Sequence, residues 1–293
     1  MNTEIPNPQS EIQLVECPRD AMQGWKHFIK TEEKVNYLNA LLQVGFHTLD
    51  FGSFVSPKAI PQMADTAAVL AGLDLSNTNT KLLAIVANVR GAEEAAAFDA
   101  IKYLGFPFSL SPKFQQRNTN SNIEEALKRV DAIQQICQQA GKELVLYLSM
   151  GFGNPYGDPY NAAVLLHWAG EMAAKGIRTI SLADTVGVAT PEQIQFALQT
   201  LIPQYKEVTF GVHLHSAPHN WQPKLTAAWD AGCRRFDGAL KGIGGCPMAA
   251  DDLVGNMDTE QMLRYFQKQP GLLQVNEQAL SRSLQLATEI FGV

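Results

Sequence analysis

Two histidines separated by one residue offer the clearest chemistry in this sequence of 293 residues. They lie in the segment VTFGVHLHS, residues 208–216, whose composition is typical of a β-strand. Because residues two apart on a strand share a face, His213 and His215 point the same way. Two imidazoles on one face can hold a single cation, provided that the nitrogens facing it carry no proton. The alternative is a pair of core histidines hydrogen-bonded to neighbouring groups.

A carboxylate and a cation stand side by side near the start of the chain, as Arg19 and Asp20. Asp20 could add an oxygen ligand and a negative charge to two neutral nitrogens, although alone it would be interpreted as a turn or helix-cap residue. Arg19 presents planar donors that suit a carbonyl or an enolate oxygen, and an arginine paired with a carboxylate in a loop would give the same pattern. Gln23 follows in the same stretch and is a further candidate for contact with a cofactor or substrate.

A cysteine in an unusual setting is the third candidate. Cys246 lies in Lys241-Gly-Ile-Gly-Gly-Cys-Pro-Met248, where the glycines permit close approach of the backbone to a ligand. It is therefore well placed to act as a proton donor or a nucleophile. The role of a small buried hydrophobe suits Cys137 and Cys233 better than a cysteine in a Gly-Gly-Cys-Pro loop. The segment is a poor phosphate cradle because it lacks the Lys-Ser/Thr pair of a P-loop.

These residues need a scaffold, and the sequence pattern predicts one. Short apolar or β-branched runs alternate with longer amphipathic segments, as in parallel strands joined by crossover helices. The expected strands are 13–18, 46–54, 81–88, 103–109, 143–150, 178–184, 208–216 and 234–240, and the expected helices are 31–44, 62–73, 91–101, 121–140, 158–175, 190–202 and 221–231, with more helical sequence from 249 onward. Eight strands predict an α/β fold of the (β/α)8 TIM-barrel type. The alternative, a doubly wound sheet, would ask for a glycine-rich turn where this chain has Pro18-Arg19-Asp20.

The barrel prediction ranks the polar residues, because the active sites of such barrels lie at the carboxyl ends of the strands. Arg19, Asp20, the histidine pair and Cys246 all end or follow an expected strand. At the end of a seventh barrel strand, a metal site becomes the favoured interpretation of the two histidines.

The composition indicates an ordinary globular chain, with 46% hydrophobic and 18% charged residues. The formal net charge is -6 and no stripe of Lys and Arg stands out, so nucleic acid is not an expected partner. We expect no membrane partner and a cytoplasmic protein, because no signal peptide and no apolar run of about 18 residues is found. Four scattered cysteines without a CxxC pair indicate free thiols. The length fits one TIM-barrel domain over 1–293, with the barrel at about 13–265 and C-terminal helices at about 266–293.

Six segments carry a family resemblance. The stretches ECPRDAMQGWK, LDFGSFVSPKAIPQMAD, SLADTVGVATPEQI, VHLHS, and GIGGCPMA with DLVGNMDTE resemble, in order and spacing, the 3-hydroxy-3-methylglutaryl-CoA lyase family of metal-dependent TIM-barrel lyases and synthases. The likeness runs from about residue 13 to about residue 265. The FVSPK and GGCP segments are specific to the lyase branch, whereas the Arg-Asp and His-x-His pairs are shared more widely.

The resemblance implies a metal site and a reaction. A divalent metal would be held by Asp20, His213 and His215, with Asn256 as a further ligand. Mg²⁺ or Mn²⁺ suits such a mixed shell of oxygen and imidazole, and Zn²⁺ is compatible with the ligand types. The reaction implied is a retro-Claisen cleavage of 3-hydroxy-3-methylglutaryl-CoA, or of a related 3-hydroxyacyl-CoA, to acetoacetate and acetyl-CoA. Coenzyme A would then enter as part of the acyl-CoA substrate.

The resemblance also implies roles for other residues. Arg19 would stabilise the enolate oxygen of the leaving acetyl-CoA, and Cys246 would act in proton transfer. The base stays open among Asp50, Asp184 and solvent on the metal. The remaining matches are Lys26, near the coenzyme A phosphates, and Glu260, which matches a glutamate four residues after the ligand asparagine. A homodimer is the oligomer that the family suggests.

Several departures from the family pattern keep alternatives open. Ser216-Ala217 stands where the lyases carry Asp-Thr, Ala21 replaces a glycine after the Arg-Asp pair, and Asp50 replaces a glutamate. The pocket can therefore have been retuned for another acyl group. One alternative is an acyl-CoA-dependent condensing synthase of the same barrel group, although such synthases usually carry more C-terminal sequence than follows residue 265 here. The other is a catalytically altered barrel that binds a ligand.

Overall fold

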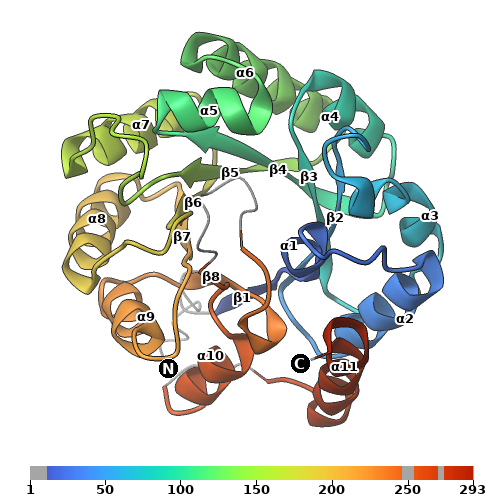
Figure 1. The fold of residues 1–293 in the computed structure, drawn as a ribbon. Coiled ribbons are helices and arrows are strands. Elements are labelled where there is room, and N and C mark those ends of the chain that lie inside the picture. The colour runs from blue at the N-terminus through green and yellow to red at the C-terminus, as the bar shows by residue number, and fades with distance from the viewer. Residues whose placement is uncertain (1–11, 246–253, 270–273, 293) are drawn as a thin grey trace, which may run out of the picture.

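Eight short parallel strands close into a barrel inside a ring of helices (Figure 1). The computed structural model describes residues 12–245, 254–269 and 274–292. Each strand pairs with the next one along the chain, and β1 pairs with β8 to close the ring. The strands are β1 (Gln13–Glu16), β2 (Thr48–Phe54), β3 (Lys81–Val86), β4 (Ile101–Ser109), β5 (Glu143–Ser149), β6 (Thr179–Ala183), β7 (Thr209–His213) and β8 (Arg235–Gly238). The predicted TIM barrel is confirmed.

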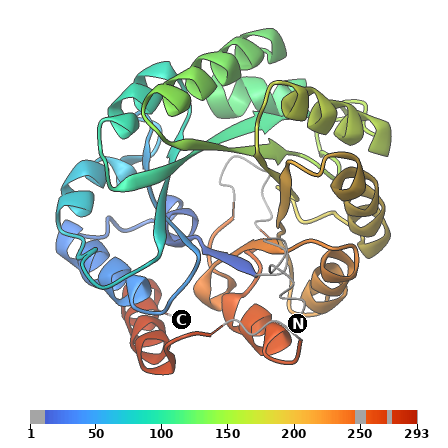
Figure 2. The same cartoon turned by 180° about the vertical axis from the view of Figure 1, so that it is seen from behind.

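Helices cover the barrel between the strands and after the last one. They are α1 (Pro18–Gln23), α2 (Thr31–Leu42), α3 (Thr66–Ala71), α4 (Val89–Ala96), α5 (Pro112–Thr119), α6 (Ile123–Gln139), α7 (Ala162–Ala174), α8 (Pro191–Gln204), α9 (Trp221–Asp230), α10 (Thr259–Phe266) and α11 (Glu277–Phe291), with 3₁₀ turns at η1 (Pro61–Met63) and η2 (Leu240–Gly242). The C-terminal α11 lies along α2 in both views (Figures 1 and 2). The ring of Phe291 stands 5.2 Å from that of Trp25 and 6.2 Å from that of Tyr37, which fixes this contact.

Two elements differ from the sequence prediction, and both lie beside the mouth of the barrel. The first strand ends at Glu16 because Pro18 opens the short helix α1, where the missing N–H of a proline needs no partner. An additional helix, α5, precedes α6. Ser111 caps it by accepting a hydrogen bond from the Phe114 N–H at 3.1 Å, and Asn120, with φ 47°, ends it. Both helices contribute residues to the site described below.

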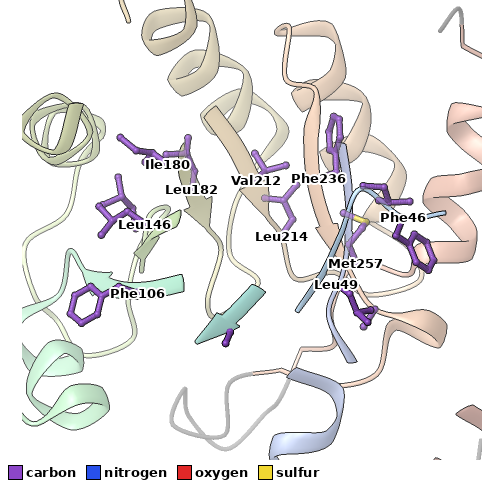
Figure 3. Packing of buried hydrophobic residues seen from close by; sticks show 14 of the residues in the cluster. Phe46, Leu49, Phe106, Leu146, Ile180, Leu182, Val212, Leu214, Phe236 and Met257 are labelled. Carbon is purple, nitrogen blue, oxygen red and sulfur yellow. The ribbon is translucent and has the colours of Figure 1, made fainter. Parts of the chain in front are cut away.

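The strands separate an apolar outer layer from a more polar interior. Buried side chains that include Phe106, Leu146, Ile180, Val212 and Phe236 pack between strands and helices (Figure 3). Because strand residues alternate in direction, their neighbours point inside the barrel. The interior holds a small apolar cluster of Leu83, Tyr103, Val145 and Tyr147, together with the charged Arg235 and Asp237. Among the residues that the structure describes, no helix is long and apolar enough to span a membrane.

Candidate active site

A cavity of about 520 Å³ opens at the carboxyl ends of the strands. Ser149, Ala183 and His213, which are the last residues of β5, β6 and β7, line it together. From α1, which lies inside the ring of helices beside β2 (Figure 1), Arg19 and Asp20 complete that side. The cavity therefore lies where barrel folds place their active sites.

Asp20 and the two predicted histidines converge at this mouth. One possible ligand atom from each of Asp20, His213 and His215 lies within 4.8 Å of the other two. The imidazole centroids are 5.4 Å apart. The structure thus brings together three groups that the sequence separates by almost 200 positions, as one cation would require.

Asn256 joins this group from the segment that precedes α10. His215 and Asn256 form an antiparallel β-bridge outside the barrel strands. The Asn256 side-chain N–H donates to Asp20 Oδ2 at 2.8 Å and to the Ile243 carbonyl at 2.9 Å. Its Oδ1 is buried and finds no donor among the described residues. A buried amide oxygen without a partner is costly, and a cation between Asp20 and the histidines would satisfy it.

The charge states of these groups also suit a cation. Burial alone would raise the pKa of Asp20, but Arg19 and the two histidines lower it to about 2. Burial and the neighbouring His213 lower the pKa of His215 to about 4. At neutral pH Asp20 is therefore ionised and His215 neutral, which are the states that bind metals.

Arg19 is held rigidly in the wall of the cavity. Its Nε and Nη2 donate to Asp50 Oδ2 at 3.0 and 2.5 Å, and its Nη1 donates to Asp20 Oδ1 at 2.9 Å and to Gln23 Oε1 at 3.0 Å. Gln23 in turn donates to Asp20 Oδ1 at 2.6 Å. Arg19, Asp20, Asp50 and Gln23 therefore form one hydrogen-bonded network beside the cavity. Asp50 belongs to this network but does not line the cavity.

The other carboxylate expected near the reaction, Asp184, is engaged elsewhere. Its Oδ2 accepts from Lys224 Nζ at 2.7 Å, and its Oδ1 accepts from the Ala189 N–H at 2.9 Å. Burial raises the pKa of Asp184, although Lys224 opposes this shift. The flanking Ala183 and Thr185 line the cavity, whereas Asp184 does not. The structure thus brings this aspartate close to the site without exposing it there.

Two further predicted residues lie apart from the cation-binding groups. Lys26 is exposed in the loop after α1 and does not line the cavity. Glu260, on α10, accepts from the backbone N–H of Lys241 at 2.8 Å and is also absent from the lining. Cys246 lies outside the described residues. The other cysteines, Cys17, Cys137 and Cys233, are buried free thiols, as predicted.

Sequence reasoning missed one residue at the centre of the site. Asp237 on β8 lies opposite His213 in the parallel register, and its Oδ2 is 3.2 Å from His213 Nδ1. Burial acts to lower the pKa of His213, but the hydrogen bond and charge of Asp237 raise it overall. An acidic residue within an expected barrel strand was the available signal.

The far end of the cavity is formed by α5 and its surroundings, which sequence reasoning also missed. Phe114, Arg117 and Asn118 line this end. Arg129 holds the end of α5 in place by donating to the Thr119 carbonyl at 2.8 Å. The signal was Ser111-Pro112, a helix cap followed by a proline at the first helical position.

Comparisons with known proteins give matches over most of the chain. The model of the family described as HMGL-like matches residues 11–287. A 3-hydroxy-3-methylglutaryl-CoA lyase of Danio rerio, named as cytoplasmic, is 30% identical over 262 residues, which cover 89% of this chain and 77% of that protein. A mitochondrial hydroxymethylglutaryl-CoA lyase of Macaca fascicularis is 32% identical over 254 residues, covering 86% and 77%.

Solved structures of similar proteins share the whole fold. The HMG-CoA lyase of Acinetobacter baumannii, in complex with coenzyme A and 3-methylmalate, has a TM-score of 0.89 at 25% identity, covering 98% of this chain and 93% of that one. The hydroxymethylglutaryl-CoA lyase of Pseudomonas aeruginosa has a TM-score of 0.88 at 28% identity, covering 97% and 94%. The resemblance found in the sequence motifs is confirmed.

Proposed function

Because the chain belongs to the HMGL-like family, a family of enzymes whose matched members are carbon–carbon lyases, we propose that it cleaves 3-hydroxy-3-methylglutaryl-CoA, or a closely related 3-hydroxyacyl-CoA, with the help of a divalent metal. The products would be acetoacetate and acetyl-CoA. The observation that supports this best is the convergence of Asp20, His213 and His215 at the barrel mouth, beside the partnerless Oδ1 of Asn256.

The metal would be held by those four side chains. Two carboxylate or amide oxygens and two imidazoles form a mixed donor set that suits Mg²⁺ or Mn²⁺ and accepts Zn²⁺. A bound divalent cation would act as a Lewis acid on the substrate oxygens and lower the pKa of the 3-hydroxyl group. Ser216, which follows the second histidine, replaces a carboxylate of the lyase pattern. The affinity for the metal is therefore expected to rest on these four ligands alone.

Arg19 is assigned to the enolate oxygen that forms when the carbon–carbon bond breaks. Arg19 lines the cavity next to Asp20, and Asp50 holds its guanidinium by accepting from Nε and Nη2. A donor fixed in advance stabilises developing negative charge without having to reorganise. Asp50 thus acts as a positioning residue for Arg19.

The proton steps need two more groups. Asp50 and Asp184 are both tied to cations and do not line the cavity, so we assign removal of the hydroxyl proton to neither. We keep Cys246 as the acid that protonates the enolate, an assignment that rests on the family motif. We leave the base unassigned among the groups that a bound metal would bring close to the substrate.

The shape and charge of the cavity favour an anionic acyl-CoA. Arg19, Arg117 and Arg129 all line it, and Asp20 is the one acidic residue among the described residues of the lining. The binding of coenzyme A and 3-methylmalate by the Acinetobacter protein supports the same class of ligand. Lys26 remains a proposed contact of the coenzyme A phosphates, and Gln23 and Glu260 remain proposed cofactor-binding residues.

One assay tests this function. The chain is stripped of metal, reconstituted with Mg²⁺ or Mn²⁺, and incubated with 3-hydroxy-3-methylglutaryl-CoA while acetoacetate is followed. A metal-bound protein without turnover would exclude the plain lyase. A second reaction with acetyl-CoA and 2-oxo acids, followed by release of free thiol, would then detect the condensing synthase. The His213→Ala variant serves as the matched control because it removes a ligand and leaves Arg19 in place.

Localisation and assembly are proposals as well. The relatives are named as cytoplasmic in some cases and mitochondrial in others, and we propose the cytoplasm for this chain. A homodimer remains the oligomer that the family suggests.

A further inference from the structure

His213 belongs to two clusters of possible ligands at once. The outer cluster is Asp20, His213 and His215, and the inner one is Cys17, His213 and Asp237, with all ligand atoms of each cluster within 4.8 Å. A neutral imidazole has one lone pair and one N–H, so it can offer a lone pair to only one of the two clusters. Which nitrogen carries the proton therefore decides whether the outer cluster can bind a cation.

The inner cluster supplies an acceptor for that proton. Asp237 is the register partner of His213 on the neighbouring strand, and its Oδ2 lies 3.2 Å from His213 Nδ1. The ring of Tyr147 stands edge-on to His213, with centroids 5.8 Å apart and planes at 87°. The imidazole is thus held from two sides, with Nδ1 turned toward the barrel interior.

The side chain of Asp237 makes no second hydrogen bond among the described residues, although its charge also raises the pKa of the buried Arg235 against the opposing effect of burial. The Asp237 side chain is 0% exposed, and its Oδ1 has no hydrogen-bond partner among the described residues. Arg235, two positions earlier on the same face, is equally buried, and its Nε and Nη2 also lack partners in that part of the chain. The aliphatic part of the Arg235 side chain lies over Gly211 and leaves no room for a side chain at that position. Burying such charges costs more free energy than apolar packing would, so stability alone does not explain the aspartate.

We propose that Asp237 is the positioning residue of the metal site, which holds His213 as the Nδ1–H tautomer and thereby presents the Nε2 lone pair to Asp20 and His215. The inference rests on the proposed metal dependence. Carboxylates that accept from the second nitrogen of a metal-binding histidine fix the ring and raise its basicity, and their loss lowers metal affinity about 10- to 100-fold. In this chain the carboxylate comes from inside the barrel, one strand away.

Calorimetric titration of the metal-free full chain with Mn²⁺ tests the assignment. The wild type should bind one ion, and Asp237→Asn should bind it about 10- to 100-fold more weakly. An asparagine can donate to Nδ1 and so place the ring proton on Nε2, where it blocks the ligand lone pair. The matched control is Cys17→Ser, which alters the same inner cluster and should leave the affinity unchanged.

Two results of the titration would overturn the proposal. One is an unchanged affinity in Asp237→Asn. The other is a wild type that binds two ions and loses one in Cys17→Ser, because the inner cluster would then itself be a metal site.

A measurement on the wild type tests the role of Asp237 even if the variant misfolds or the chain binds no metal. The two-bond ¹⁵N–¹H spectrum of the six histidines is recorded on metal-free protein at alkaline pH. An Nδ1–H tautomer for His213 supports the role of Asp237 whether or not Mn²⁺ binds, and an Nε2–H tautomer refutes it. If the chain binds no divalent ion while His213 shows the Nδ1–H form, the proposed function fails and the assignment of the tautomer stands.

Discussion

Two buried ion pairs allow the roles of Asp50 and Asp184 to be separated by one matched experiment. Asp50 pairs with Arg19 at 2.5 Å, and Asp184 pairs with Lys224 at 2.7 Å. The carboxylates are 1% and 0% exposed. The substitutions Asp50→Asn and Asp184→Asn therefore each remove one negative charge from an equally buried position. Asp50 contacts Arg19, which lines the cavity, whereas the partner of Asp184, Lys224, does not line it.

The expected loss of stability is similar for both variants. Removing one partner of a buried pair costs about 3–5 kcal/mol, because the other charge stays buried. Each cation keeps other acceptors here: Arg19 retains Asp20, and Lys224 retains the carbonyls of Gly187 and His215 at 3.0 and 2.8 Å. We therefore expect the lower end, roughly 3 kcal/mol, which a domain with about 5–15 kcal/mol of stability survives. Equilibrium unfolding in urea measures this loss.

The effects on catalysis should differ. In Asp50→Asn the guanidinium of Arg19 loses the negative charge beside it and one of the two oxygens that accept from it, so its orientation is less well fixed. A displacement of about 1 Å can lower kcat by roughly 10²-fold. Asp184→Asn should keep kcat near the wild-type value. Acetoacetate formation is measured for both at saturating Mn²⁺, with metal content checked because Lys224 also binds the carbonyl of His215. A large loss of kcat in Asp184→Asn with the metal retained, together with an active Asp50→Asn, would refute this reasoning and identify Asp184 as the base.

Three further outcomes follow from the same structure. Asn256→Ala should weaken Mn²⁺ binding by roughly 100-fold or more in calorimetry, since the loss of a ligand should exceed that of an outer carboxylate; unchanged affinity would remove Asn256 from the ligand set. Cys246→Ala should lower kcat by roughly 10²-fold while metal binding persists, and retained activity would leave the thiol a packing role. Burial raises the pKa of Glu16 from 4.5 to about 8, so the folded chain keeps a proton that the unfolded chain releases. The free energy of unfolding should therefore fall as pH rises through this interval, and Glu16→Gln should flatten that slope in urea titrations at several pH values.

The fold followed from the sequence because its signals are local. Each strand is a short apolar run and each helix an amphipathic one, so eight alternations predict a barrel without knowledge of any contact. The errors occurred where a single residue overrides the pattern. Pro18 converts the expected end of the first strand into a helix, and the Ser111 cap begins a helix within a segment that looks like a loop.

The site could be predicted only in part, for a geometric reason. The expected strand places His213 and His215 on one face; β7 ends at His213, but His215 lies two residues beyond it in a β-bridge and both line the cavity. Asp20 follows the end of β1, so position in the chain is enough to predict that the three residues meet. The partners of the other carboxylates lie far along the chain. Lys224 is 40 positions from Asp184, and Arg19 is 31 positions from Asp50, so no local pattern shows that these aspartates are already engaged. The contact between Asp237 and His213 depends on the register of β7 against β8, which is known only once the barrel is closed.

The contact between Asp20 and Asn256 spans 236 positions of the chain and lies near the seam where β1 meets β8. A second bond across that seam joins Glu16 to the backbone N–H of Leu240 at 2.8 Å. The complete set of proposed ligands exists only after the barrel has closed, so a nascent chain that ends before Asn256 cannot form it. A cation bound there would stabilise the closed barrel, and this stabilisation grows with the logarithm of the free cation concentration. Opening of the barrel at this seam, seen by hydrogen exchange in β1 and β8, should therefore respond to the supply of metal in the cell.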